Sequence, residues 1–228
     1  MSDDTGYVLY RGKYTRSLLA EMVMAEGGID YEGRDVDIFK DEHRDPAFLA
    51  LNPAGFVPAL VTPAGDVLHE TAAINLYLAD RHAAGDLAPS TDDPLRGPFM
   101  SGMFLIAGEL EPALKRVFYP HRYAVREADH DAVASLSMTQ ANRWFDHFET
   151  RLTTDGSYYL GGRYSLVDLT VAFWAAMLDG DGMFGPYPAV RACLAKVRAR
   201  RAVAAHFDLL YQWADEYESE IGGSEDHR

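Results

Sequence analysis

The first part of the chain alternates between strand-like and helix-like spacing of hydrophobic residues. A short apolar and aromatic segment at 7–10 indicates a strand. Apolar residues then recur at helical spacing over 18–24, and this helix is expected to close at the glycine pair 27–28. The segment YEGRDVDIF, at 31–39, alternates like a second strand. These segments predict strand, helix and strand in that order.

The next segments extend this pattern to a small α/β layout. We expect a short helix at 46–50, and ALV and DVL on either side of the turn sequence TPAG predict an antiparallel hairpin at 59–68. A helix then begins with Glu70 and Thr71. The order βαβ-α-ββα predicts a thioredoxin-like domain, in which helices cover both faces of a small mixed sheet.

Beyond residue 94 the hydrophobic pattern is helical. Glycine, prolines and acids first interrupt the periodicity between Ala83 and Pro94. Long helical stretches then follow at 95–126, 129–153, 165–178, 188–201 and 203–217. We therefore expect an α/β plus all-α protein. Its parts are a thioredoxin-like domain at 1–84, a linker at 85–94, an all-helical domain at 95–221 and a disordered tail at 222–228.

One of the predicted helices begins with a capping pair. Ser165 supplies an N-cap hydroxyl, and Asp168 supplies a carboxylate three residues later. Each can satisfy a backbone donor of the first turn, so we expect a structural role for the pair.

The composition excludes several classes of partner. The formal charge of −14 argues against nucleic acid and anionic membranes, which need a basic protein surface. No apolar run approaches the roughly 20 residues of a membrane span, and no signal-peptide pattern is present. The single cysteine, Cys193, excludes a disulfide framework and a CxxC pair, and its helical setting predicts a buried, inert thiol. We expect a cytoplasmic protein.

Local positive charge and cofactor motifs narrow the chemistry further. Arg11, Lys13 and Arg16 follow the first predicted strand and could attract an anionic substrate, or could be an ordinary solvated loop. The histidines show no paired metal-ligand spacing, and neither a GxxxxGK[ST] phosphate loop nor a GxSxG elbow occurs. We expect no metal and no nucleotide cofactor.

The segment LNPAGFVPALVTPAGDVLHETAAINLYLADR, at 51–81, is suited to hold an extended peptide-like ligand. Pro58 keeps Val57 extended and offers no amide donor of its own, so the backbone of Val57 is available to a guest. Glu70 and Thr71 place a carboxylate and a hydroxyl at a helix start, where they could bind an ammonium group.

This segment resembles the soluble glutathione transferases, and the likeness extends along nearly the whole chain. The resemblance implies a cis bond at Val57–Pro58, pairing of the Val57 backbone with the cysteinyl part of glutathione, and a γ-glutamyl grip by Glu70 and Thr71. It also places Phe56 and Pro58 among the glutathione-binding residues, although many family members carry Lys or Arg at the position of Phe56 and most carry Ser at that of Thr71. The family's chemistry also implies glutathione as cosubstrate.

The thiol of glutathione must be activated as a thiolate, and a hydroxyl donor near a helix N-terminus lowers a thiol pKa. The resemblance places that donor in YRGKYTRS, where four residues remain open: Thr15, Tyr14, Tyr10 and Ser17. The turn from Tyr14 to Ser17 is preferred over Tyr10, because a hydroxyl there shares the helix terminus with the thiolate. Tyr10 could instead be a core aromatic, and Thr15 or Ser17 a helix cap.

The resemblance also suggests residues for the two remaining parts of a site. His43 would contact the glycine end of glutathione, with Arg44 or Lys13 as alternatives. An electrophile pocket would lie along the first long helix of the second domain, although such a stripe is more often core. Its predicted lining residues are Met103, Phe104, Ala107, Glu111, Tyr119 and Tyr123.

The leading hypothesis is a glutathione S-transferase that adds glutathione thiolate to a small apolar electrophile, or isomerises or reduces it, as in detoxification. The alternative is an interaction module that kept the fold without turnover, since fold does not imply function. A glutathione-dependent thiol-disulfide oxidoreductase is a third possibility. The resemblance further implies a homodimer.

Overall fold

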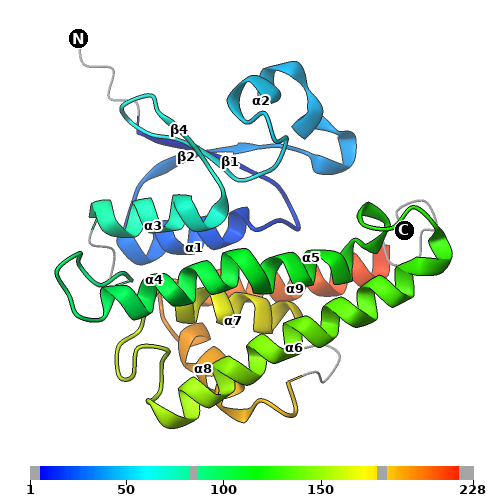
Figure 1. Ribbon diagram of the computed structural model, residues 1–228. Coiled ribbons are helices and arrows are strands. Elements are labelled where there is room, and N and C mark those ends of the chain that lie inside the picture. Colours follow the sequence, from blue (N-terminus) through cyan, green and yellow to red (C-terminus); the bar gives the residue numbers. More distant parts are fainter. Residues whose placement is uncertain (1–5, 83–86, 179–183, 221–228) are drawn as a thin grey trace. The chain divides into compact units, whose positions relative to one another are not determined.

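The computed structural model divides into two compact units, and each is described by itself (Figure 1). The structure describes residues 6–82, 87–178 and 184–220. The first unit comprises the chain up to Ala88 together with Arg200–Ala214, and the second comprises Pro89–Ala199 and the residues from Asp215 onward. The domain boundaries expected at 84 and 95 stay predictions, and the expected tail at 222–228 lies outside the described residues.

A four-stranded mixed sheet forms the centre of the first unit. Its strands are β1 (Tyr7–Arg11), β2 (Tyr31–Asp35), β3 (Ala59–Val61) and β4 (Val67–His69), in the order β2-β1-β3-β4. Strand β1 runs parallel to β2 and antiparallel to β3, and β3 pairs with β4 as the predicted hairpin. The helices of this unit are α1 (Ser17–Gly27), α2 (Pro46–Leu51) and α3 (Thr71–His82).

Alternation along β1 and β3 divides the apolar residues between the two faces of the sheet. Leu9 and Leu60 are register partners, are fully buried and share one face. Tyr10 and Ala59 point to the other face, where they pack with Phe48 of α2. Helices α1 and α3 lie on one side of the sheet and α2 on the other, so the predicted thioredoxin-like layout is confirmed (Figure 1).

Two element ends in this unit follow from local chemistry. Helix α1 ends where Gly28 adopts a left-handed conformation, with φ of 59°, which glycine reaches without strain. Strand β2 is shorter than the predicted 31–39, because the side chain of Asp37 accepts the amides of Phe39 and Lys40. This capping turns the chain into a 3₁₀ turn at Ile38–Lys40 and ends the strand at Asp35.

The second unit is helical in the part that the structure describes. Its helices are α4 (Arg96–Leu105), α5 (Glu111–Phe118), α6 (His130–Thr154), α7 (Leu166–Leu178) and α8 (Pro188–Arg198), and α9 (Ala204–Glu220) spans both units. The helices predicted from residue 129 onward are present, with ends shifted by three residues or fewer.

The helix predicted at 95–126 is wrong in its length. Pro112 has no amide and its ring crowds the carbonyl of Gly108, so α4 widens into a π turn at Ile106–Leu110 before α5. The helix then ends at Phe118, because Pro120 disfavours the helical conformation at Tyr119, whose φ and ψ are −131° and 56°.

The Asp168 half of the predicted capping pair at the start of α7 is confirmed, and the Ser165 hydroxyl donates to the Asp168 carboxylate. Asp168 is buried, and one carboxylate oxygen accepts the amide and the hydroxyl of Ser165 at 2.8 and 2.9 Å. The other oxygen accepts the amide of Tyr159 at 2.6 Å. The carboxylate therefore joins the helix start to the segment that precedes it. Cys193 is buried, as predicted, and burial raises the pKa of its thiol.

Candidate functional site

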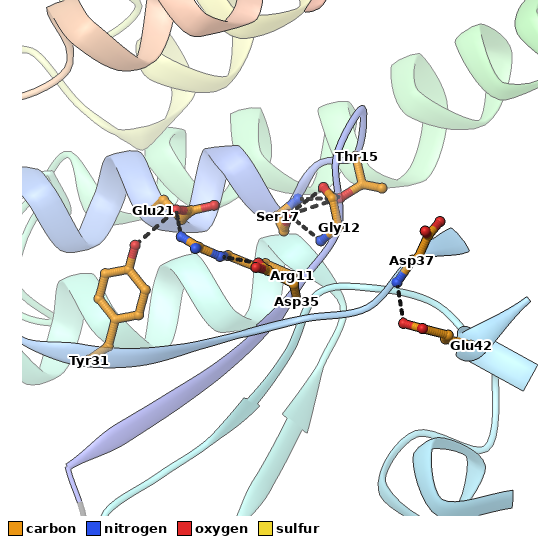
Figure 2. Close-up of polar contacts among 9 residues, drawn as sticks. All are labelled: Arg11, Gly12, Thr15, Ser17, Glu21, Tyr31, Asp35, Asp37 and Glu42. Atoms are coloured by element: carbon orange, nitrogen blue, oxygen red, sulfur yellow. Dashed lines mark hydrogen bonds and ion pairs between the residues drawn. The ribbon is translucent and has the colours of Figure 1, made fainter. Parts of the chain in front are cut away.

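The turn between β1 and α1 brings two predicted hydroxyl groups onto one backbone unit, that of Gly12. Thr15 Oγ1 donates to the Gly12 carbonyl at 2.7 Å, and Ser17 Oγ donates to the same carbonyl at 3.2 Å (Figure 2). Ser17 Oγ also accepts the Gly12 amide at 3.1 Å, and the two hydroxyl oxygens are 2.8 Å apart. Ser17 is fully enclosed, whereas Thr15 is partly exposed.

Gly12 is closely surrounded by residues from three segments. A Cβ atom at this position would lie 3.0 Å from the Val36 carbonyl oxygen and 3.2 Å from the methyl carbons of both Thr15 and Val57. The close approach requires glycine here. It also means that the methyl groups of Thr15 and Val57, two residues predicted separately from the sequence, both approach the same point beside Gly12.

Tyr10 and Tyr14 have different surroundings. The Tyr10 ring packs edge-on against Phe48, on the face of the sheet that α2 covers, and its hydroxyl accepts a hydrogen bond from Arg34 at 3.0 Å. Tyr14 has a positive φ of 60°, which is uncommon for an aromatic residue, and its ring contacts Trp213 of α9. Tyr10 is thus directed away from the start of α1, and Tyr14 is a strained part of the turn.

A charged network fixes the strand residue that precedes this turn. Arg11 pairs with Glu21 of α1 at 2.7 Å and with Asp35 of β2 at 2.8 Å, and Tyr31 donates to the same Glu21 oxygen at 2.9 Å (Figure 2). Burial, reinforced by the Glu21 carboxylate, raises the pKa of Tyr31 to about 12. The Asp35 and Glu21 carboxylates raise the pKa of Arg11 as well. Arg11, which could have attracted an anionic substrate, is therefore paired inside the unit.

The segment before β3 is held by Asn52, which is not among the predicted site residues. Asn52 is buried, its Nδ2 donates to the Phe56 carbonyl at 2.7 Å, and its Oδ1 accepts the Ala54 amide at 3.1 Å. The Val57–Pro58 bond that follows is cis, as the resemblance implied. Asparagine ahead of a proline is a common turn signal, and this signal could have identified the residue.

We predict that Asn52→Ala weakens both stability and any ligand contact made by Val57. The lost hydrogen bonds leave the Phe56 carbonyl and the Ala54 amide without their partner, which costs about 1–3 kcal/mol. Urea unfolding measures the change. Asn52→Asp, which keeps the acceptor for Ala54 and loses the donor to Phe56, should lie between Ala and wild type; equal stability of all three would contradict this role.

His43 and Arg44 form part of a 3₁₀ turn at Glu42–Arg44, close to the same segment. The guanidinium carbon of Arg44 lies 6.0 Å from the centre of the Phe56 ring. His43 is mostly buried, and its Nε2 lies 4.0 Å from an Asp41 carboxylate oxygen. The role of His43 toward a ligand stays a prediction.

The start of α3 combines backbone strain with an unused polar atom. Glu70 is exposed and has a positive φ of 69°. Thr71 is buried, and its hydroxyl oxygen has no hydrogen-bond partner among the described residues. Strained residues and unsatisfied buried polar groups are both concentrated at functional sites.

The predicted electrophile-pocket residues all lie in the second unit and have unequal exposure. Met103 is buried, whereas Phe104 and Tyr123 are exposed by 66% and 50%. The carboxylate of Glu111 is buried and accepts the indole N–H of Trp174 at 3.2 Å. Ala107 and Tyr119 are partly buried. Their roles as pocket residues stay predictions.

Within the described ranges, no three His, Cys, Asp or Glu side chains converge as metal ligands. Among the helices so described, none has the length and apolar character required to cross a membrane.

Comparison with known proteins identifies the family. Residues 17–81 match the family model described as "Glutathione S-transferase, N-terminal domain", and 115–208 match "Glutathione S-transferase, C-terminal domain". Maleylacetoacetate isomerase from Pseudomonas aeruginosa is 32% identical over 72% of this chain and 76% of its own length. Glutathione S-transferase 3 from Zea mays is 30% identical over 79% of this chain and 83% of its own length.

A solved structure supports the same family. A glutathione transferase homolog from Sulfitobacter, crystallised with bound glutathione, is 28% identical, with a TM-score of 0.79 over 90% of this chain and 98% of its own. The family models together cover both units of the described structure, and the relatives extend over most of the chain. The chain belongs to the glutathione S-transferase family.

Proposed function

We propose that this glutathione S-transferase holds glutathione against Val57, Glu70 and Thr71, and that Thr15 donates a hydrogen bond to its thiolate. The observation that carries the proposal is that the side chains of Thr15 and Val57 both approach the same point beside Gly12. A peptide paired with the Val57 backbone would then have its cysteinyl side chain close to the Thr15 hydroxyl. The thiolate would also lie near the N-terminus of α1, which favours an anion.

The surroundings of these side chains favour Thr15 over Ser17 and Tyr10. Ser17 is enclosed and already bonded to both polar atoms of Gly12. The Tyr10 ring packs against Phe48, while its hydroxyl accepts from Arg34. Thr15 is partly exposed, and its oxygen accepts the amide of Ser17 at 3.3 Å. If its proton turns to a thiolate, the Gly12 carbonyl keeps the hydrogen bond from Ser17. Thr15 can therefore donate to a ligand without leaving the Gly12 carbonyl unsatisfied.

The start of α3 supports a grip on the γ-glutamyl end. A buried hydroxyl without a partner costs about 1–3 kcal/mol, and a ligand carboxylate would satisfy it. The adjacent carboxylate of Glu70 is suited to an ammonium group, so the pair matches an amino acid end that carries both charges. Relatives of this chain have been crystallised with bound glutathione, which agrees with the proposal.

Calorimetry with S-methylglutathione tests the grip separately from the thiol. We predict that Thr71→Val weakens binding about tenfold, because one hydrogen bond to a charged group is lost. The same replacement at Thr150, an exposed residue of α6 whose hydroxyl donates to the Asp146 carbonyl, should leave the affinity unchanged. Wild-type protein that releases no heat with millimolar glutathione would exclude the proposed site.

A second candidate reaction is isomerisation. Two of the relatives are named for it, maleylacetoacetate isomerase and, from Ralstonia, maleylpyruvate isomerase, which is 29% identical over 72% of this chain. Such a reaction returns glutathione unchanged, whereas conjugation consumes it. Incubation with maleylacetoacetate should distinguish them, since product formation without loss of free thiol identifies the isomerase.

We further propose a cytoplasmic homodimer that conjugates apolar electrophiles in detoxification. Phe56 is 49% exposed beside the hairpin, which suits a contact with a second copy of the chain. Light scattering should give twice the mass of one chain at micromolar concentration. A single-chain mass would contradict the dimer and leave the proposed glutathione site intact.

A further inference from the structure

Tyr14, the strained residue of the turn between β1 and α1, contacts aromatic rings from distant parts of the chain. The Tyr14 ring lies edge-on to Phe39, with centroids 5.8 Å apart, and edge-on to Trp213, with centroids 5.7 Å apart. Lys13 Nζ lies 4.6 Å from the centre of the same ring. A left-handed conformation of a non-glycine residue persists only where the surroundings enforce it. These ring contacts are among the surroundings that hold Tyr14 in this conformation.

Trp213 is itself firmly placed within the first unit. Val203, Phe207 and Leu210 recur at helical spacing along the start of α9 and are buried, and Trp213 follows Leu210 by one turn on the same side. Arg200 forms a two-bond ion pair with Glu26 of α1, at 2.6 and 2.8 Å. Because the start of α9 is anchored to α1, the indole of Trp213 has a fixed position against the turn that precedes α1.

Phe39 is placed in a comparable way. It belongs to the 3₁₀ turn that Asp37 caps, and the Asp37 amide donates to Glu42 Oε2 at 2.7 Å (Figure 2). Phe39 is 44% exposed, so its side of Tyr14 is open to solvent, whereas Trp213 is anchored through buried neighbours. Of the two contacts, that of Trp213 therefore constrains Tyr14 more strongly.

The conformation of Tyr14 decides where Thr15 lies. The chain leaves β1 at Arg11 and must reverse within the turn for the Thr15 hydroxyl to return to the Gly12 carbonyl. A right-handed Tyr14 would redirect the chain one residue before Thr15 and open that 2.7 Å hydrogen bond. We propose that Trp213 is a positioning residue of this turn: its contact keeps Tyr14 left-handed and so keeps the Thr15 hydroxyl on the Gly12 carbonyl. The inference rests on the proposed function of Thr15.

The test is the thiol pKa of bound glutathione, read from thiolate absorbance against pH, together with the affinity for S-methylglutathione. Trp213→Leu should raise the bound thiol pKa by about one unit, since about tenfold of thiolate stabilisation is lost when the strained residue relaxes. The affinity for S-methylglutathione should stay within about twofold, because the γ-glutamyl grip is unchanged. Trp213→Phe keeps a ring edge, so it should retain most of the lowering of the bound thiol pKa. Its smaller shift can be measured if the leucine variant does not fold.

A second replacement isolates the mechanism. Glycine adopts the left-handed conformation without strain, so in a Tyr14→Gly background Trp213→Leu should no longer change the bound thiol pKa. The same change at Trp144 of α6, a partly buried residue of the second unit, is the matched control and should leave the pKa unchanged.

The outcomes separate the two proposals. A wild-type complex with the thiol pKa of free glutathione contradicts the proposed function itself. A depressed wild-type value that Trp213→Leu does not alter overturns the role of Trp213 alone. A shift that persists fully in the Tyr14→Gly background also overturns it, because Trp213 would then act by another route.

Discussion

Replacing Thr15 by Val should lower kcat/KM about 100-fold, because removing one preorganised donor to a developing or resident anion has an effect of that order. Valine preserves the shape of the side chain and the contact with Gly12, so the replacement removes the hydroxyl while keeping the packing. The pKa of the bound glutathione thiol should rise toward its value in solution. Thiolate absorbance in the binary complex and steady-state turnover measure the two effects.

Three further variants distinguish Thr15 from its neighbours. Thr15→Ser keeps a hydroxyl and should retain most activity, while Tyr10→Phe should have little effect, since that ring packs against Phe48. Ser17→Ala removes an internal bond of the turn, so it should reduce stability more than it changes the thiol pKa. Full activity of Thr15→Val would reject the assignment and point back to the other hydroxyl groups.

Replacing Asp168 by Ala should produce the largest loss of stability, about 3–5 kcal/mol, because each buried donor left without its acceptor costs about 1–3 kcal/mol. The amides of Tyr159 and Ser165 and the Ser165 hydroxyl would all lose their acceptor. Urea unfolding measures the change. Asp131→Ala, an exposed acidic residue in the first turn of α6, is the control and should cost no more than about 1 kcal/mol.

Comparing the stability of wild type with that of Asp168→Asn measures how the ionisation of Asp168 affects folding. Burial raises the pKa of Asp168 to about 6 from its ordinary value of 3.8, although its hydrogen bonds oppose the shift. A group whose pKa is raised in the folded state contributes stability that is present below the unfolded pKa and is lost as pH rises through the folded pKa. The stability of wild type relative to Asp168→Asn should therefore decrease between about pH 4 and pH 7. A difference that grows over this range would contradict the raised pKa.

The fold was largely predictable because its signals are local. Periodicity located the helices and strands, and the cues at Gly28, Pro58 and Ser165 lie within a few residues of the features they create. The helix predicted at 95–126 shows where this reasoning failed. Periodicity continues through Pro112 and Pro120, whereas the backbone responds to each proline by a π turn or an end. The spacing of apolar residues indicates which face of a helix is buried. It does not indicate whether each residue has the amide N–H that a helix needs.

The sequence predicted only part of the candidate site. The resemblance selected Val57, Glu70 and Thr71, because their motif is contiguous. It left four hydroxyl groups open, since a turn of eight residues can present any of them to a ligand. Asn52 was missed although its hydrogen bonds reach only two and four residues along the chain, where asparagine ahead of proline is a turn signal.

By itself, the sequence determined the kind of fold and the family, because these depend on short-range patterns. The tertiary structure brought the methyl groups of Thr15 and Val57 together beside Gly12. It also paired Arg11 with Glu21 and Asp35, and it brought Trp213 against Tyr14 across about two hundred residues of chain. The physical reason is that hydrogen bonds and ring contacts depend on positions in space. In this chain those positions are set by the packing of α1, the sheet and the start of α9, which no local pattern specifies.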